Sequence, residues 1–510
     1  MNPVSWPVAF VQARAGFVLL APEMLLALFG LLTLLLDLAL DEEQKSWNAL
    51  PALLGLALSG CALVMVGFGA QTASAFGNAI VIGPFSGYFG LLALMLATLL
   101  ILLCTHASGP ASRQSGEGYA LVLLATAGLT LLACANDLVV LFVAFETVSV
   151  SSYALANVGG ADRSSLEGTL RFLFAGAFST ALLAYGFSLL YGLGGSTNLS
   201  VISARIEVLS QLSSAENSLL GMALAATGGA ILLRIAGAPL HSGTPDIGER
   251  TPPAVAGFVS VAAKLACFTL LLRLLFSIFW RERYDWAILL MFAAVAAMAI
   301  GTLASLRQKN TKRLLAYSAI AQGGYVLLAI AASVNRDGSF NARGLGSAGY
   351  YLLAFVIFQI GAFATAIVLR ERETAGENVA SLNDLNGLNG LLRKHPVAGG
   401  SVIFLLLSCV GVPPTAGFIA KLEVVRVLFA NQHGAVGWTA VLFAIPPIYP
   451  SFRIVRAMWT DGTGATERMP LSDAQVVALV VMVILTLLLG VLPAPFEHFA
   501  AQSLGVLVLR

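Results

Sequence analysis

Three ionisable side chains lie deep inside apolar stretches of this sequence. They are Glu146 in LVVLFVAFETVSV (138–150), Lys264 in VSVAAKLACF (259–268) and Lys421 in GFIAKLEVV (417–425). A charge near the centre of a bilayer costs ~2.5–3.5 kcal/mol on insertion scales, so such residues are paired or functional. Carboxylates and amines both exchange protons, and burial shifts the proton affinities of both groups toward neutral pH. This set of residues therefore indicates proton transfer inside a membrane.

Arg234 is a fourth buried charge, and it immediately precedes the sequence IAGAP. An arginine keeps its proton at physiological pH, so it cannot readily carry a proton. We therefore interpret Arg234 as a fixed counter-charge. Three other charges lie in apolar stretches: Glu23, Asp37 and Glu423. For these residues a structural role, in a static ion pair or with the side chain reaching the membrane surface, is at least as good an explanation as a functional role.

The composition excludes several other classes of protein. Of the 510 residues 58% are hydrophobic and 11% are charged, with a mean hydropathy of +0.87, whereas a soluble domain carries about 25% charged residues. The five cysteines form no CxxC pair, the five histidines are scattered, and no glycine-rich phosphate loop is present. Metal, disulfide, iron–sulfur and nucleotide sites are therefore disfavoured. The net charge of +2 and the lack of a basic run argue against nucleic acid.

Long runs rich in Leu, Ala and Val predict about fourteen transmembrane helices, since a span needs about 20 apolar residues. The predicted spans are 16–40, 50–70, 85–104, 118–134, 137–157, 168–192, 218–237, 253–276, 286–304, 311–332, 345–369, 397–430, 436–459 and 475–493. The first run is too long for a cleaved signal peptide and is expected to be a membrane helix.

Two of these spans are interrupted by Gly and Pro, at 234–239 (RIAGAP) and 408–414 (SCVGVPP). Broken helices survive in a membrane only where they are buried in protein or line a cavity. Breaks at matching positions of two halves indicate internal repeats with a site at their interface. The breaks fall in predicted helices seven and twelve, so the repeats would be inverted; chance recurrence of a Gly-X-Pro pattern is the alternative.

We therefore expect an all-α polytopic membrane protein with two inverted five-helix repeats. The expected segments are a three-helix segment (1–115), a first repeat (116–280), a second inverted repeat (281–460) and a C-terminal helix (461–510). Lys and Arg favour the odd-numbered loops, including LRQKNTKR (306–313) and LRKH (392–395), which predicts that these loops are cytoplasmic and that the termini are periplasmic.

Four motifs, in order, resemble the antiporter-like membrane subunits of respiratory complex I, the NADH–quinone oxidoreductase. They are DLVVLFVAFETVSVSSYALAN (137–157), PLHSGTPDIGERTPPAVAGFVSVAAK (239–264), NTKRLLAYSAIAQGGYVLLA (310–329) and GVPPTAGFIAK (411–421). The match is spread over about residues 118–430. Among these subunits the chain is most similar to the subunit N family, which LLAPEMLL at 19–26 also suits.

The resemblance implies a proton-translocating subunit in a bacterial inner membrane. It implies that Glu146, Arg234, Lys264 and Lys421 form the proton path. Four further residues are implied as supporting ones: Pro239, His241, Tyr317 and Pro413. It also implies no cofactor or metal on this chain, with NADH, FMN, iron–sulfur clusters and quinone in the rest of the complex. The partners implied are the other complex I subunits, especially neighbouring antiporter-like and small membrane subunits.

The chain departs from the family at Arg234, where a lysine is usual, and at Gln322, where a histidine is common. Three alternative functions are therefore kept: a subunit of a multisubunit Na⁺/H⁺ antiporter, a membrane subunit of a hydrogenase or formate-linked complex, and a structural copy that transports nothing.

Overall fold

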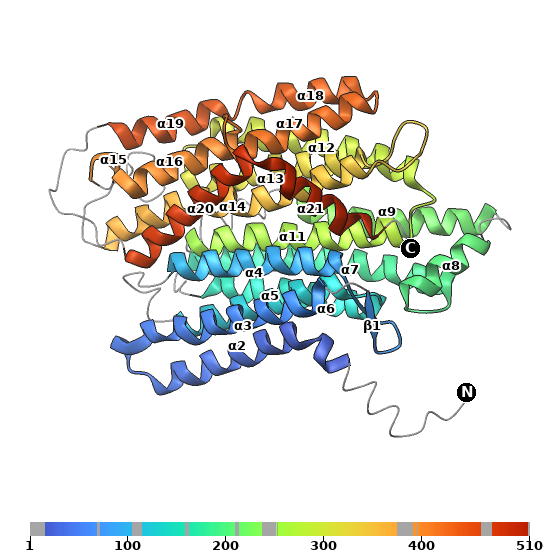
Figure 1. Ribbon diagram of the computed structural model, residues 1–510, viewed down its shortest axis with the longest axis horizontal. Helices are drawn as coiled ribbons and strands as arrows, with labels where there is room; N and C mark the ends of the chain where they lie inside the picture. Colours follow the sequence, from blue (N-terminus) through green and yellow to red (C-terminus); the bar gives the residue numbers. More distant parts are fainter. Residues whose placement is uncertain are drawn as a thin grey trace.

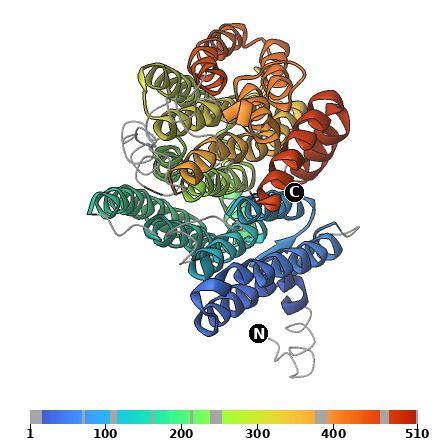
Figure 2. The same ribbon diagram turned by 90° about the vertical axis from the view of Figure 1, so that its left-hand side faces the viewer.

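The computed structural model describes residues 16–68, 72–104, 115–158, 163–209, 214–236, 251, 253–374, 391–394, 396–460 and 472–507. Within these ranges the chain is a bundle of long α-helices with one short β-hairpin. Figure 1 shows the helices side by side along their lengths, and Figure 2 shows the same bundle nearly end-on.

The helices and strands have the following bounds. The first half contains α2 (Ala21–Ala39), the 3₁₀ helix η1 (Glu42–Asn48), α3 (Ala49–Gly67), β1 (Ala73–Ala75), β2 (Ile80–Ile82), α4 (Pro84–Cys104), α5 (Ser115–Cys134), α6 (Leu138–Asn157), α7 (Arg163–Gly194), α8 (Leu199–Leu209) and α9 (Ser214–Ala236). The second half contains α11 (Pro253–Ser277), α12 (Arg283–Arg307), α13 (Thr311–Ala331), α14 (Ala342–Thr374), α15 (Leu391–Lys394), α16 (Pro396–Val410), α17 (Ala416–Ala430), α18 (Gly434–Ala444), α19 (Ile448–Trp459), α20 (Asp473–Val491) and α21 (Pro493–Gly505).

Thirteen helical stretches of the described chain are long and apolar enough to cross a membrane. α18 and α19 count as one of them. The predicted twelfth span, 397–430, corresponds to α16 and α17, which are separated by residues 411–415. The thirteen stretches and this interrupted pair together match the expected fourteen spans. The expected all-α membrane fold is therefore confirmed, while the division into inverted repeats stays a prediction.

Three helices form the centre of the bundle. In the most apolar part of each helix, 94% of residues are buried in α13 and α14 and 89% in α11, against 22% in α2 and 17% in Gly434–Trp459. The outer helices expose large apolar side chains such as Phe174, Phe292 and Leu38, which lipid tails solvate as readily as a protein core does. Lys264 on α11 therefore lies in protein rather than in lipid.

Local sequence signals determine several helix starts. Asp137 caps α6, with its carboxylate accepting a hydrogen bond from the Val139 N–H at 2.8 Å. Asn310 caps α13 in the same way, and Ser472 with Gln475 forms a capping box at α20. Such side chains satisfy N–H groups that lack a partner inside the helix. The charge of Asp137 at the start of the fifth span therefore has a structural explanation.

Several short elements were not predicted from the sequence. Strands β1 and β2 pair antiparallel with Ala73 opposite Ile82 and Ala75 opposite Ile80. Helix α8 follows α7 before the chain enters α9, and α21 follows α20 within the predicted C-terminal segment. The hairpin and α21 are too short to give a hydropathy signal of the length used to assign a span.

Candidate functional site

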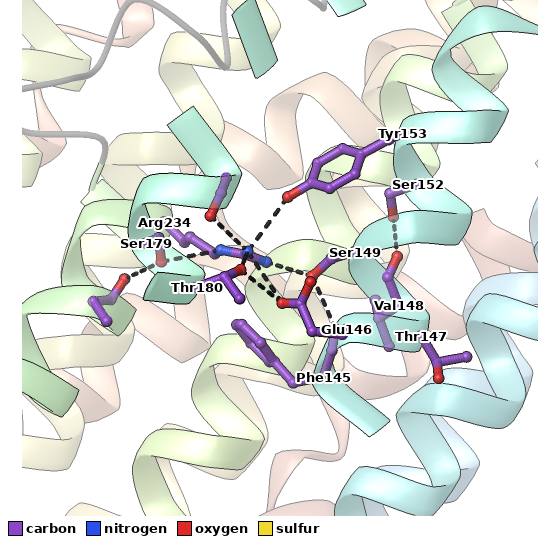
Figure 3. A network of polar contacts seen from close by, with 12 residues as sticks. Phe145, Glu146, Thr147, Val148, Ser149, Ser152, Tyr153, Ser179, Thr180 and Arg234 are labelled. Carbon is purple, nitrogen blue, oxygen red and sulfur yellow. Dashed lines mark hydrogen bonds and ion pairs between the residues drawn. The ribbon is translucent and has the colours of Figure 1, made fainter. Parts of the chain in front are cut away.

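Glu146 and Arg234 meet where α6, α7 and α9 pack together. The Glu146 Oε1 atom lies 3.5 Å from Arg234 Nη2 and accepts a hydrogen bond from the Thr180 hydroxyl at 2.7 Å. The two charged side chains are 24% and 13% exposed, respectively. Thr180 also accepts a hydrogen bond from Arg234 Nη2 at 2.7 Å. Thr180 thus connects the arginine to the carboxylate, as Figure 3 shows.

The rest of the Arg234 guanidinium is held by oxygen atoms of α6 and α7 (Figure 3). It donates from Nε to the Ser179 hydroxyl at 3.1 Å, from Nη1 to Ser149, and from Nη2 to the Gly176 carbonyl at 3.1 Å and the Tyr153 hydroxyl at 3.3 Å. Only arginine offers five N–H donors in a planar fork. A lysine here would leave several of these acceptors without a donor.

The orientations of the two serine hydroxyls explain why they accept from Arg234. Ser149 donates its own proton to the Phe145 carbonyl at 2.8 Å, and Ser179 donates to the Ala230 carbonyl at 2.8 Å. Their lone pairs therefore face the guanidinium. The Phe145 ring lies under the guanidinium, with its centroid 4.6 Å from the central carbon, and adds a cation–π contact.

Lys264 is 1% exposed and lies across a cavity from Arg234. Its Nζ atom is 3.4 Å from both the carbonyl and the hydroxyl oxygen of Ser260, one turn earlier on α11. The cavity has a volume of about 70 Å³ and is lined by Lys264, Arg234, Tyr153, Ser149 and Ser260, among others. One water needs about 10–15 Å³ of such volume. Several waters can therefore connect the two cations.

Lys421 is bound at the break between α16 and α17. In a continuous helix the carbonyls of Cys409 and Val410 would accept hydrogen bonds from the N–H groups of residues 413 and 414. Those residues are Pro413 and Pro414, which have no N–H. Lys421 Nζ donates to these two carbonyl oxygens, at 3.1 Å from Cys409 and 2.6 Å from Val410. The prolines thus create the acceptors that stabilise a buried ammonium, at the partially negative end of α16.

Gly411 and Tyr325 complete the surroundings of Lys421. Gly411 has a φ of +92°, a left-handed conformation that favours glycine, and a β-carbon there would lie 3.1 Å from Lys421 Cδ. The Tyr325 ring centroid lies 5.3 Å from Nζ. The bend at Gly411 therefore brings the carbonyl end of α16 against the lysine without a side-chain clash.

Helix α13 lies between the two lysines. A β-carbon at Gly323 would be 3.9 Å from Lys264 Cε. The preceding residue, Gln322, donates from Nε2 to the same Cys409 carbonyl that accepts from Lys421, at 2.7 Å, and accepts a hydrogen bond from the Tyr351 hydroxyl. Consecutive residues of α13 thus contact the surroundings of both cations.

The structure places Glu146 beside Arg234, and Arg234 and Lys264 line one cavity. Consecutive residues of α13 contact the surroundings of Lys264 and of Lys421. That the four residues form a proton path stays a prediction. Pro413 has the structural effect described above. Tyr317 packs in a small apolar cluster with Ala297 and Ile320, and its supporting role stays a prediction. Pro239, His241 and the break expected after Arg234 lie outside the described residues.

The sequence interpretation missed the residues that hold Arg234. Ser149 and Tyr153 follow Glu146 by three and seven positions on α6, a spacing that places all three on one helix face. That signal was available. Gly176 and Thr180 come from α7, and nothing in the sequence links them to Glu146. Among the described residues no group of three or more His, Cys, Asp and Glu could hold a metal; the absence of a cofactor on this chain stays a prediction.

Comparisons with known proteins identify relatives over nearly the whole chain. Residues 135–445, which contain all four path residues, match the family described as "NADH:quinone oxidoreductase/Mrp antiporter, TM". A curated relative, NADH-quinone oxidoreductase subunit N 1 of Koribacter versatilis, is 35% identical over 97% of this chain and 96% of its own length.

Solved structures agree on the fold. A chain of respiratory complex I from Thermus thermophilus with bound aureothin is 28% identical, covers 94% of this chain and 99% of its own, and has a TM-score of 0.73. A chain of the Mrp complex from Dietzia sp. DQ12-45-1b has a TM-score of 0.78 at 19% identity, covering 95% of this chain and 97% of its own. The second likeness shows a common fold alone.

Proposed function

Because this chain belongs to the NADH:quinone oxidoreductase/Mrp antiporter family of membrane subunits, we propose that it moves protons across the membrane as subunit N of a NADH–quinone oxidoreductase. The observation that carries the proposal is the arrangement of the buried charges. Glu146 lies beside Arg234, Arg234 and Lys264 line one cavity, and α13 contacts the surroundings of Lys264 and of Lys421. Electron transfer from NADH to quinone would take place in other subunits, and no redox centre is proposed on this chain.

In the proposed mechanism Arg234 sets the charge state of Glu146 without carrying a proton. Its N–H groups are directed at oxygen atoms of α6 and α7, so it moves only if those helices move. A change in the separation of Arg234 and Glu146 changes the proton affinity of the carboxylate, because the Coulomb term between them depends on distance. Movement of one helix would thereby be converted into proton uptake or release.

Proton transfer beyond this pair would use water and the two lysines. The cavity between Arg234 and Lys264 has room for a chain of waters. Within the part of the chain that the structure describes, Lys264 contacts Ser260 at long distances, so its ammonium can exchange protons with that water. The Gln322 amide and the Tyr351 hydroxyl provide polar atoms next to the Cys409 carbonyl that binds Lys421.

The proposed location is a bacterial plasma membrane, with both termini on the periplasmic side. This orientation is supported by the excess of Lys and Arg in the odd-numbered loops of the sequence. The proposed partners are the other membrane and peripheral subunits of complex I, chiefly the adjacent antiporter-like and small membrane subunits.

The proposal is tested in inverted membrane vesicles that carry either the native chain or Glu146→Gln. NADH-driven quinone reduction and acidification of the vesicle lumen are followed together, and we expect both to fall in the variant. If neither changes, the chain is not part of an NADH-driven pump. Proton transport that requires sodium and not NADH would identify the antiporter function instead.

The fixed-charge role of Arg234 has its own test in the same vesicles. Arg234→Gln removes the charge, whereas Arg234→Lys keeps the charge and loses part of the hydrogen bonding. We expect Arg234→Gln to abolish pumping and Arg234→Lys to retain part of it. The role is wrong if both variants pump like the native chain.

A further inference from the structure

A second, larger cavity lies at the end of the bundle where α11 ends and α12 begins. Its volume is about 770 Å³, within the range of ~300–1,000 Å³ typical of ligand pockets. Its walls come from β2, α8, the end of α11, the connection to α12 and the last residues after α21. Figure 1 shows β1 and α8 at the same end of the bundle. None of its lining residues lines the cavity between Arg234 and Lys264.

Positive charge dominates the lining. Arg273, Arg281 and Arg283 line the cavity, with Glu207 as the one carboxylate among its lining residues. Glu282, which does not line it, lies 3.9 Å from Arg281. Guanidinium groups bind phosphate oxygens through paired N–H donors. The lining therefore suits an anion with several oxygen atoms.

Two of the arginines are held in place by the fold. Arg283 donates from Nε to the Gly338 carbonyl at 2.6 Å, and its guanidinium lies 5.5 Å from the Trp280 ring centroid. Arg273 is 4% exposed and lies 5.0 Å from the centroid of the Phe85 ring. The side chain of Arg281 is 46% exposed. A ligand would thus meet two arginines held by the fold and a third, Arg281, that is partly exposed.

Aromatic side chains form another part of the cavity lining. Phe276 and Trp280 stack with ring centroids 5.5 Å apart, and both line the cavity with Phe85. Tryptophan is enriched where a membrane meets water, because its ring is apolar and its N–H is polar. Basic residues beside aromatic rings at the end of a membrane helix match a molecule with an anionic head and an apolar body.

We propose that this cavity binds the phosphate headgroup of an anionic phospholipid, with Arg281 and Arg283 on the phosphate oxygens and Phe276 and Trp280 against the glycerol and upper acyl chains. Paired guanidinium donors match the oxygen atoms of such a headgroup. The bound lipid would connect β2, α8 and the α11–α12 corner, which all contribute to the lining of this cavity. The same arginines could bind inorganic phosphate or an acidic segment of another subunit, and the experiment separates these sources.

The test uses the full chain purified in detergent and native mass spectrometry. Phosphatidylglycerol, phosphatidylcholine and inorganic phosphate are titrated separately. Phosphate or an acidic peptide is then added, in separate experiments, to the phosphatidylglycerol complex. The native chain should bind phosphatidylglycerol at least about tenfold more tightly than phosphatidylcholine. Millimolar phosphate should not displace it, because phosphate lacks the apolar body.

Variants locate the site. Arg281→Gln with Arg283→Gln should weaken phosphatidylglycerol binding by about thirtyfold, and the double Lys variant should restore part of it. Arg307→Gln is the control, since Arg307 is an exposed arginine at the other end of α12. Equal binding of the two lipids to the native chain overturns the proposal, and this result does not depend on any variant folding. So do unchanged binding in the folded double Gln variant, displacement by phosphate alone, or displacement by an acidic peptide.

Discussion

Thr180 provides the sharpest test of the Glu146–Arg234 arrangement. Its hydroxyl accepts a hydrogen bond from Arg234 Nη2 and donates one to Glu146 Oε1, both at 2.7 Å. Thr180→Val removes the hydroxyl and keeps the shape of the side chain. The carboxylate would then keep only its 3.5 Å contact with the guanidinium. We expect the charge state of Glu146 to respond less strongly to movement of Arg234.

The size of the effect follows from the kind of bond that is lost. Hydrogen bonds to charged groups contribute about 1.5–3 kcal/mol in soluble proteins, whereas hydrogen bonds between membrane helices average about 0.6 and reach about 1.7 kcal/mol. Both partners of Thr180 are charged, which favours the upper part of the membrane range, and Glu146 is 24% exposed, which reduces the effect. We therefore expect a loss of about 1.4 kcal/mol, or about tenfold in the rate of the coupled step.

The assay is the initial rate of NADH-driven quinone reduction and lumen acidification in inverted vesicles, measured for Thr180→Val, Glu146→Gln and the double variant. If Thr180 acts through Glu146, its substitution should have little further effect once Glu146 is neutral. Thr180→Ser keeps the hydroxyl and should pump at close to the native rate. A fall of less than twofold in Thr180→Val, or an equal fall in both backgrounds, would refute the relay.

Three further predictions concern neighbouring features. Gly176→Ala would place a β-carbon on the Tyr153 hydroxyl, so we expect a loss of about 1–3 kcal/mol of stability in thermal unfolding, together with slower pumping. Gln322→Leu would remove the donor to the Cys409 carbonyl and the acceptor of a buried tyrosine hydroxyl, costing about 1–3 kcal/mol in the same measurement. Burial, and then the nearby Glu423 carboxylate, raises the pKa of Glu497 on α21 above its usual 4.5. Its contribution to stability is therefore present below pH 4.5 and lost as the pH rises through the raised value, so Glu497→Gln should be the more thermally stable chain near neutral pH.

Matched variants make these predictions specific. Gly192→Ala places a β-carbon in open space and should leave both stability and pumping unchanged. Gln322→His keeps a donor and an acceptor and should be closer to the native chain than Gln322→Leu. For Glu497 the comparison is made at pH 4 and pH 8; a stability difference that does not grow with pH would contradict the raised pKa.

The membrane class, the number of spans and the four buried charges at Glu146, Arg234, Lys264 and Lys421 can be identified from the sequence. Apolar runs of about 20 residues form helices in a bilayer whatever surrounds them, since their backbone groups must bond internally. Lysine and glutamate stand out in such runs because each carries a large insertion cost. The effect of Pro413 and Pro414 on the backbone can also be predicted locally. In a helix the N–H of residue i bonds to the carbonyl of residue i−4, so the two prolines leave the carbonyls of Cys409 and Val410 without a backbone donor.

Which partners those charges have was decided only by the tertiary structure. Thr180 lies 34 residues from Glu146 along the chain, and Gln322 lies 87 residues from the Cys409 carbonyl it binds. The sequence around a polar side chain does not indicate which other helix that side chain will contact. Helix packing depends on the shapes of the side chains over the whole interface. The cavity between Arg234 and Lys264, and the arginine-lined cavity at the α11–α12 corner, exist only where separate helices leave space between them. The charges that must be accommodated can thus be predicted from the sequence, while the way each one is bound depends on the assembled bundle.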